Sequence, residues 1–153
     1  MTGRITAYWA TAVAVVLLVS GCAKAVDTAL CHTNPRGWSE DARIEYNNSD
    51  TLSLRDLSFF VRLNTAAERC ELPVTIRIEA PDSTFATERC VWHLATERGS
   101  SPTATIERIG YRTECQLTQH GKYRFIVVPD RPVRGVEAVG IIIEKRDNDN
   151  GKR

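Results

Sequence analysis

Residues 74–94, VTIRIEAPDSTFATERCVWHL, determine the class of fold that this chain can adopt. Apolar and polar side chains alternate one by one over residues 74–79, and Cys90, Trp92 and Leu94 alternate with Arg89, Val91 and His93 further on. Side chains two apart on a strand point to the same face, so each half can bury one face and expose the other. The segment between them contains Ala-Pro-Asp-Ser at 80–83, a strong turn signal. The stretch therefore predicts two consecutive antiparallel strands joined by a tight turn.

The same period of two recurs along the rest of the chain, and no long helical pattern interrupts it. Turn signals rich in glycine, proline, asparagine and aspartate separate the alternating segments. The further segments are 44–46, 57–63, 109–117, 123–127 and 139–143. About seven strands at this spacing predict an all-β fold, an antiparallel β-sandwich of the jelly-roll or immunoglobulin-like kind.

The N-terminal residues 1–21 have the composition of a secretion signal. Arg4 is their only charge, and the apolar run at 7–19 is too short to span a membrane comfortably. Val19-Ser20-Gly21-Cys22 resembles the bacterial lipobox, in which the cysteine becomes the first mature residue and carries the lipid. We therefore expect lipidation at Cys22 and a membrane attachment through it; the alternative is a plain anchor helix with a chance cysteine.

These features divide the chain into a lipoprotein signal peptide at 1–21, a lipidated tether at 22–36, a β-sandwich at 37–146 and a disordered tail at 147–153. Loss of the signal removes Arg4, so 19 basic residues face 19 acidic residues in the mature chain. This balance gives no basic surplus for nucleic acid, and we expect no nucleic-acid partner.

Four cysteines remain in the mature domain, at Cys31, Cys70, Cys90 and Cys115. Their spacing lacks the close pairs of a zinc site, and an exported chain meets an oxidising environment that favours disulfides. Cys90 and Cys115 lie on the apolar faces of consecutive predicted strands, which suggests a Cys90–Cys115 bridge and leaves Cys31 for Cys70. Buried free thiols are the alternative.

The polar residues give no catalytic pattern. His32 follows Cys31, but neighbours on an extended chain point apart, so adjacency does not make a nucleophile–base pair. There is no phosphate loop, no nucleophile elbow and no zinc-protease motif. We therefore expect a non-enzymatic protein with no cofactor and no metal. Trp38 and Phe60 stand outside the apolar strand faces, which makes them candidates for ligand or partner contact.

Three stretches occur in a fixed order behind the lipobox: CHTNPRGWSEDARIEY at 31–46, LSLRDLSFFVRLN at 52–64 and GKYRFIVVPDRPVRGVEAVGIIIEK at 121–145. Together they resemble the gliding-motility lipoprotein H (GldH) family of the Bacteroidota. The chain departs from that family in its middle, where ATERGSSPTAT at 95–105 replaces a longer loop. The resemblance implies a non-enzymatic envelope lipoprotein, an accessory or structural component of a gliding-motility or type IX secretion-associated complex.

Two other functions stay open at this point. One is a carbohydrate- or small-ligand-binding periplasmic lipoprotein that uses Trp38 or Phe60 as a stacking platform, and the other is a thiol-active protein that uses Cys31. Asp27 is the one acidic residue shortly after Cys22, a poor match to the acidic cluster of surface-exported lipoproteins in this phylum. We therefore expect attachment to the outer membrane, facing the periplasm, beside other envelope proteins.

Three stretches read aspartate, then serine or threonine, then an apolar residue or threonine; they begin at Asp27, Asp50 and Asp82. This order resembles an O-glycosylation signal of Bacteroidota envelope proteins and marks Thr28, Thr51 and Ser83 as possible acceptors. The alternative is that these are ordinary turn residues, whose side chains bond to nearby backbone.

Overall fold

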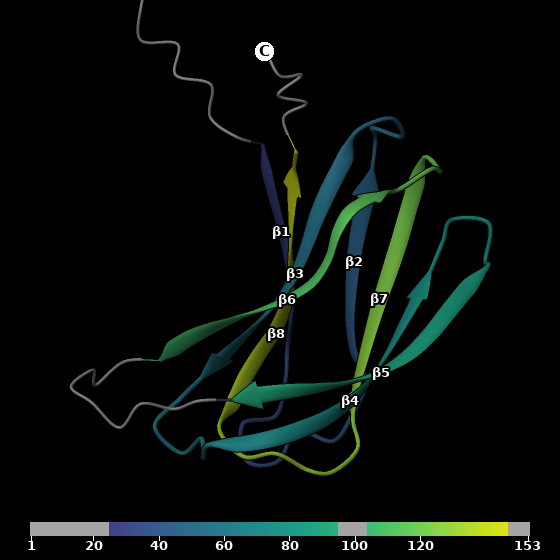
Figure 1. The fold of residues 1–153 in the computed structure, drawn as a ribbon. Helices are drawn as coiled ribbons and strands as arrows, with labels where there is room; N and C mark the ends of the chain where they lie inside the picture. The colour runs from purple at the N-terminus through teal and green to yellow at the C-terminus, as the bar shows by residue number, and fades with distance from the viewer. Residues whose placement is uncertain (1–24, 95–103, 147–153) are drawn as a thin grey trace, which may run out of the picture.

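The computed structural model describes residues 25–94 and 104–146, and these form eight antiparallel strands (Figure 1). The strands are β1 (Val26–His32), β2 (Ala42–Asn48), β3 (Leu54–Leu63), β4 (Cys70–Glu79), β5 (Phe85–Leu94), β6 (Thr105–Gln116), β7 (Gly121–Pro129) and β8 (Val136–Lys145). The predicted all-β sandwich is confirmed, with one strand more than expected.

The strands form two four-stranded sheets, one in the order β1-β8-β3-β6 and the other in the order β2-β7-β4-β5. The first strand therefore pairs with the last, the second with the seventh, the third with the sixth and the fourth with the fifth. This is one long hairpin rolled into a sandwich, the arrangement of a jelly roll. The immunoglobulin fold distributes its strands differently.

The faces that the period-two pattern assigned to the interior are the faces that the sandwich buries. The largest buried side chains include Phe59, Phe125, Ile76 and Trp92. The Phe59 ring is central, because it packs against Trp92 at 5.5 Å, Tyr111 at 5.0 Å and Phe125 at 6.4 Å between centroids. Aromatic rings from both sheets thus meet at one point, and their burial helps to hold the sheets together.

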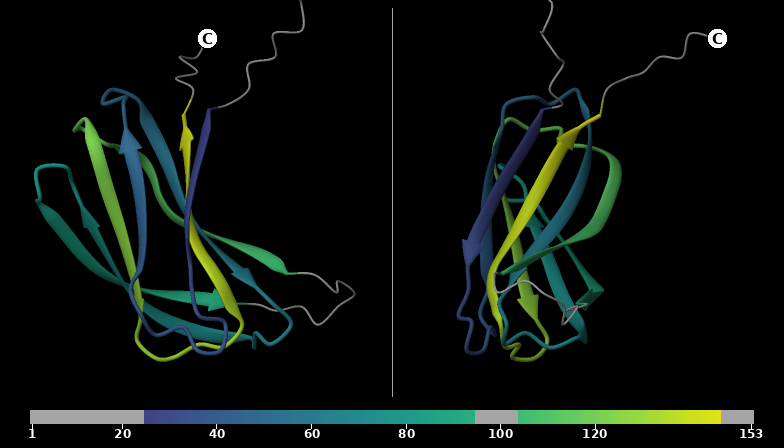
Figure 2. Two further views of the ribbon diagram at one scale, coloured as in Figure 1. Left: turned by 180° about the vertical axis from the view of Figure 1, so that it is seen from behind. Right: turned by 90° about the vertical axis from the view of Figure 1, so that its left-hand side faces the viewer.

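The sandwich is closed along one side and open along the other (Figure 2). On the closed side, the edge strands β1 and β2 approach each other across the sheets. On the open side, the edge strands β5 and β6 diverge, and among the described strands no comparable approach joins them. A cavity of about 370 Å³ opens between the sheets here, lined by Leu57, Phe125 and Cys115 among others.

The expected tether at 22–36 was wrong for residues 26–32, which form β1 and pair with β8 from Val26–Glu144 to His32–Ala138. Its inward residues, Ala29 and Cys31, pack against the core only partly. Small inward side chains and an exposed outer face give a weak alternating pattern, so the strand escaped detection.

Strand β6 carries two register shifts against β3. Because of them, Arg112 pairs with the inward-facing Leu57, and Glu114 adopts a positive φ of 55°. A bulge changes the direction of the side chains that follow it. Arg112 thereby reaches β5 across the gap, where it contacts Glu88 at 3.0 Å.

Candidate functional site

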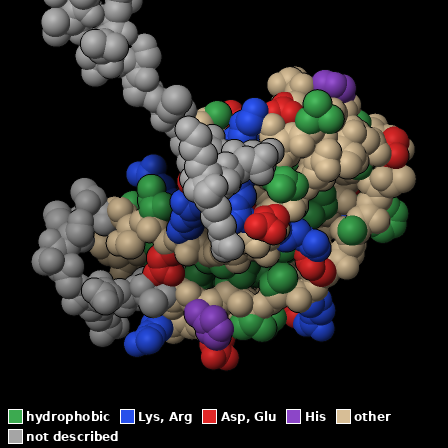
Figure 3. All heavy atoms as spheres, turned by 45° about the horizontal axis from the view of Figure 1, so that its top comes forward, with side chains coloured by type: hydrophobic (Ala, Val, Ile, Leu, Met, Phe, Trp, Pro, Cys, Tyr) green, Lys and Arg blue, Asp and Glu red, His purple; other side chains and the backbone are tan. Residues whose placement is uncertain are grey.

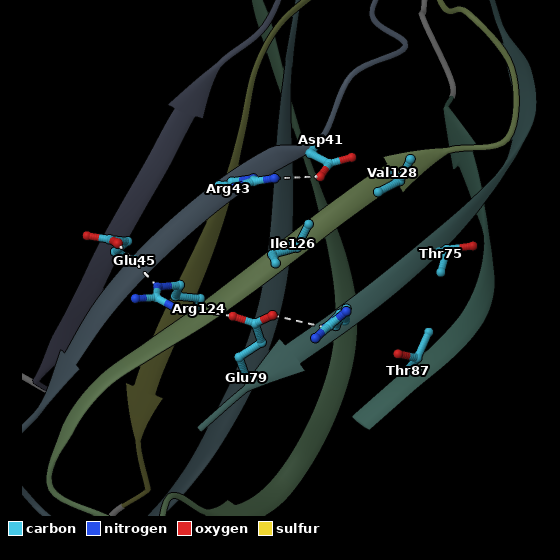
Figure 4. A pocket seen from close by; sticks show the side chains of 10 residues that line it. Asp41, Arg43, Glu45, Thr75, Glu79, Thr87, Arg124, Ile126 and Val128 are labelled. Carbon is cyan, nitrogen blue, oxygen red and sulfur yellow. Dashed lines mark hydrogen bonds and ion pairs between the residues drawn. The ribbon is translucent and has the colours of Figure 1, made fainter. Parts of the chain in front are cut away.

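The outer face of the β2-β7-β4-β5 sheet forms a broad hollow of about 730 Å³ (Figure 4). Every strand of that sheet contributes side chains that point to its solvent-facing side. The lining residues are Asp41, Arg43 and Glu45 beside or on β2, Arg124, Ile126 and Val128 on β7, Thr75, Arg77 and Glu79 on β4, and Thr87 on β5. The sequence predicted that several of these residues lie on solvent-exposed strand faces, but it did not indicate that they lie together in one hollow.

A row of alternating charge crosses the hollow at one level. Arg124 pairs with Glu45 on β2 and with Glu79 on β4 in the backbone register. Its guanidinium lies 3.5 Å from a Glu45 oxygen and 3.3 Å from a Glu79 oxygen. A hydrogen bond from Lys122, with help from Arg124, holds the pKa of Glu45 below its usual value. The Glu45 carboxylate therefore stays charged at neutral pH.

The next row places an apolar side chain between two cations. Ile126 pairs with Arg43 on one side and with Arg77 on the other. Arg43 contacts Asp41 at 3.1 Å, whereas Arg77 contacts Glu79 at 3.0 Å and lies 4.0 Å over the Phe85 ring. The two guanidinium groups are thus held in place on either side of Ile126.

The arrangement suits binding and offers no obvious chemistry. Most of its ionisable groups are exposed and already engaged in ion pairs, and their side chains carry both signs. Exposed pairs of this kind contribute little to stability, so they can exchange partners at small cost. A wide and shallow polar surface resembles a protein-interaction face more than a ligand cleft, which is usually apolar and enclosed.

The hollow continues to a free sheet edge at β5. This strand has ten residues and is the last of its sheet, so one side of its backbone has no neighbouring strand in the described fold. Two large apolar side chains are exposed along it, Phe85 at 60% and Val91 at 52%. An unpaired edge with apolar side chains readily accepts an added strand.

Trp38 and Phe60 do not belong to any exposed site, so their predicted role as contact residues was wrong. Trp38 is 1% exposed and donates its indole N–H to the Glu40 carbonyl at 2.8 Å. Phe60 is 7% exposed and lies over Gly140, its partner on β8. The ring covers the space that a side chain at Gly140 would occupy. This explains why an aromatic residue on the solvent-facing side of the strand is buried.

The premise for a Cys90–Cys115 bridge was wrong, because β5 and β6 lie in different sheets and do not form a hairpin. The four cysteines of the described residues are free thiols in this structure. Burial raises the pKa of both the Cys90 and the Cys115 thiol, which keeps them protonated and poorly nucleophilic. Cys31 packs partly against the core, and its neighbour His32 is exposed, so the pair forms no dyad.

The possible glycosylation residues have different environments. Thr28 is exposed on β1, Thr51 is half-buried in the β2–β3 loop and Ser83 is exposed in the β4–β5 turn at a φ of 68°. The preceding aspartates have structural contacts: for example, Asp82 accepts hydrogen bonds from the Thr84 hydroxyl and amide, which lower its pKa. Such contacts agree with the turn-residue interpretation and leave the acceptor oxygens of Thr28 and Ser83 accessible.

Lipidation at Cys22 lies outside the described residues, as does the predicted tail at 147–153. The described ranges contain no helix with the length and apolar character needed to span a bilayer. Within the same ranges, no cluster of three histidine, cysteine or acidic side chains could hold a metal ion.

No protein-family model matches this chain, and no curated protein is significantly similar to it. Two distant structural matches are chains in the structures of infectious bursal disease virus, from the Gt strain and the Gx strain. The first is 14% identical with a TM-score of 0.36 and covers 83% of this chain and 38% of its own. The second is 13% identical with a TM-score of 0.36 and covers 81% of this chain and 36% of its own. The chain thus spans well under half of either matched chain, and such distant likeness carries no functional argument.

Proposed function

We propose that this chain is a non-catalytic envelope lipoprotein that binds another protein as an accessory or structural subunit. The lipobox at residues 19–22 supports the anchor, and the ordered resemblance to the gliding-motility lipoprotein H family supports a gliding-motility or type IX secretion-associated complex. The observation that carries the binding role is the charged hollow together with the free edge of β5.

The hollow presents both signs of charge in a fixed pattern around Ile126. A partner with the opposite pattern would be guided into one orientation, because complementary charges set register and speed of association more than affinity. The exposed Phe85 and Val91 beside it add apolar area, which is the component that contributes affinity. The two features lie on one sheet, so a single partner segment can reach both.

The test is capture of crosslinked partners from the native host by the lipidated protein, followed by mass spectrometry. We expect the double substitution Arg43→Glu and Arg77→Glu to reduce recovery of the specific partner at least about tenfold, since each reversal opposes the pattern. The control is Arg62→Glu, an exposed residue of β3 on the outer face of the other sheet, paired with Glu137 at 3.1 Å. Equal recovery with both variants, at unchanged melting temperature, would contradict the binding role of the hollow.

The anchor has its own test. Cys22→Ala is expected to abolish lipidation and to leave the precursor uncut, visible as a larger band on a gel and by intact mass. Attachment to the outer membrane on its periplasmic side predicts protection from proteinase K added to intact cells. Degradation under those conditions would contradict the periplasmic orientation.

A carbohydrate- or small-ligand-binding lipoprotein is the second candidate, favoured by the volume of the hollow. Its stacking platform would have to be Phe85, since Trp38 and Phe60 are buried. Calorimetric titration with envelope polysaccharides distinguishes the two: saturable binding lost in Phe85→Ser, without any captured protein, favours the second candidate.

O-glycosylation of Thr28, Thr51 or Ser83 is a further part of the proposal. The measurement is the intact mass of the native protein before and after all three are changed to alanine. A native mass equal to polypeptide plus lipid would exclude the modification.

A further inference from the structure

The chain leaves the sandwich very close to the cysteine that we propose as its anchor. Ala25 already belongs to the sheet, because its carbonyl accepts a hydrogen bond from the Lys145 amide at 3.1 Å. Only Ala23 and Lys24 separate it from Cys22. Three residue steps span at most about 11 Å, even when the backbone is fully extended. A lipid on Cys22 therefore leaves the domain little freedom to move away from the bilayer.

The loop nearest to this exit is the β2–β3 loop at residues 49–53. The Lys145 ammonium donates to a carboxylate oxygen of Asp50 at 3.1 Å, which joins the exit of the chain to this loop. Asp50 also accepts from the Leu52 and Ser53 amides at 3.0 and 3.1 Å, and from the Ser53 hydroxyl at 2.6 Å. The conformation of the loop is thus fixed by its own hydrogen bonds.

The fixed loop holds Leu52 away from the domain. This side chain is 84% exposed, the highest value among the exposed large apolar residues of the described chain. Val26, at the start of β1, is 49% exposed at the same end. Figure 3 brings this end forward and shows basic and acidic side chains interspersed over it. A mixed surface with a projecting leucine gives no attraction to anionic lipid and relies on apolar insertion.

We infer that the sandwich rests on the phospholipid bilayer with this end, and that Leu52 enters the boundary between headgroups and acyl chains. This inference rests on the proposed lipidation of Cys22. The occupant of the surface is the bilayer that holds the lipid, because the tether is too short for the end to face anything else. The charged hollow lies on the outer flank of a sheet, so it stays accessible to a partner beside the domain.

The experiment uses the lipidated full-length mature protein in phosphatidylcholine vesicles that contain brominated acyl chains, which quench tryptophan at short range. Leu52→Trp places the probe in the loop, and Arg134→Trp places it in the exposed β7–β8 connection at the opposite end. Trp38 and Trp92 are 1% and 2% exposed and give a constant background. We expect quenching at position 52 to exceed that at position 134 at least roughly twofold.

A Gly/Ser insertion of twelve residues between Ala23 and Lys24 tests whether the short link to Cys22 is what holds Leu52 against the bilayer. A flexible insertion of this length adds about 20 Å of reach, and it is expected to lower quenching at position 52 toward the value at position 134. Equal quenching at both positions in a lipidated protein, or quenching unaffected by the insertion, would overturn the inference. A protein whose intact mass shows no lipid would instead contradict the proposed function, and the orientation would fall with it.

Discussion

Arg55 and Arg112 both point into the space between the two sheets, and their surroundings are opposite. Arg55 is 5% exposed and contacts the Tyr46 hydroxyl at 3.1 Å and the Asn48 amide oxygen at 3.4 Å, with Asp27 at 3.9 Å. The Arg112 side chain is 49% exposed; it forms an ion pair with Glu88 across the gap and lies 5.3 Å over the ring of its neighbour Tyr111. One arginine ties three strands together on the closed side, and the other forms a single surface pair on the open side.

The difference shows that the two sides of one jelly roll are held together in different ways. Buried, hydrogen-bonded charges are costly to disturb, so the closed side behaves as a fixed unit, and the proposed anchor would lie at its end. A single exposed pair contributes at most about 1 kcal/mol, so the open side depends on the shared aromatic core. The open side is therefore the one that can change its shape at the lower cost in stability.

The largest effect is expected where both sides depend on the same core. Phe125→Ala removes a side chain with 0% exposure that packs against Phe59, and it should destabilise the domain by about 3–5 kcal/mol. Arg124→Ala, the neighbouring residue with a 52% exposed side chain, should cost under about 1 kcal/mol. The measurement is the free energy of unfolding in urea. Equal losses would show that the core does not unite the two sides.

A second prediction compares two strand glycines. A Cβ on Gly140, in the closed half, would lie 2.2 Å from the Phe60 ring and 2.7 Å from the Ala29 carbonyl oxygen, whereas one on Gly110, on the open edge, meets nothing within 4 Å. Gly140→Ala should therefore cost about 3 kcal/mol, the upper end of the usual overpacking range. Gly110→Ala should be neutral or slightly stabilising. If Gly110→Ala lost as much stability as Gly140→Ala, our distinction between a tightly packed closed side and an open side would be wrong.

The arginines themselves give the third comparison. Methionine keeps most of the stem and removes the charge, so Arg55→Met breaks the contacts to Tyr46 and Asn48 and should cost about 2 kcal/mol. This expected loss of stability is smaller than for a fully buried ion pair, because the Asp27 side chain is 56% exposed. Arg112→Met should cost at most about 1 kcal/mol. Thermal unfolding of both variants measures the difference, and a larger shift for Arg112→Met would reverse our assignment of the closed side.

The smallest expected effect is on how the stability of the fold depends on pH. Hydrogen bonds from Ser53 and Leu52, together with Lys145, hold the pKa of Asp50 well below its usual value. Because the unfolded chain binds this proton more readily, the contribution of Asp50 is complete above its ordinary pKa of about 4 and is lost as the pH falls below it. Asp50→Asn should therefore lower stability at pH 7 and reduce the further loss between pH 5 and pH 3. An unchanged acid-dependent loss in the variant would show that Asp50 does not fix the loop.

Much of the fold could be predicted because alternation is a local property. The inward positions Phe59, Ile76 and Val127 were all assigned to buried faces and are all 0% exposed. β1 was missed because its inward residues are small or polar and give no apolar alternation. Phe60 was misassigned because its burial depends on a glycine that lies 80 positions further along the chain, at Gly140. The hollow could not be predicted, since its ten residues come from four strands and the segment just before one of them.

The sequence by itself determined that this chain forms antiparallel strands and which faces most of those strands bury, and it places Cys22 at the end of a stretch that resembles a lipobox. Only the tertiary structure decided which strands become neighbours, because the pairing of a rolled hairpin joins residues far apart in the chain. That pairing separates β5 from β6, brings Gly140 under Phe60 and gathers the charges around Ile126. The period of two specifies the face of each side chain, but it carries no information about the strand that will lie beside it.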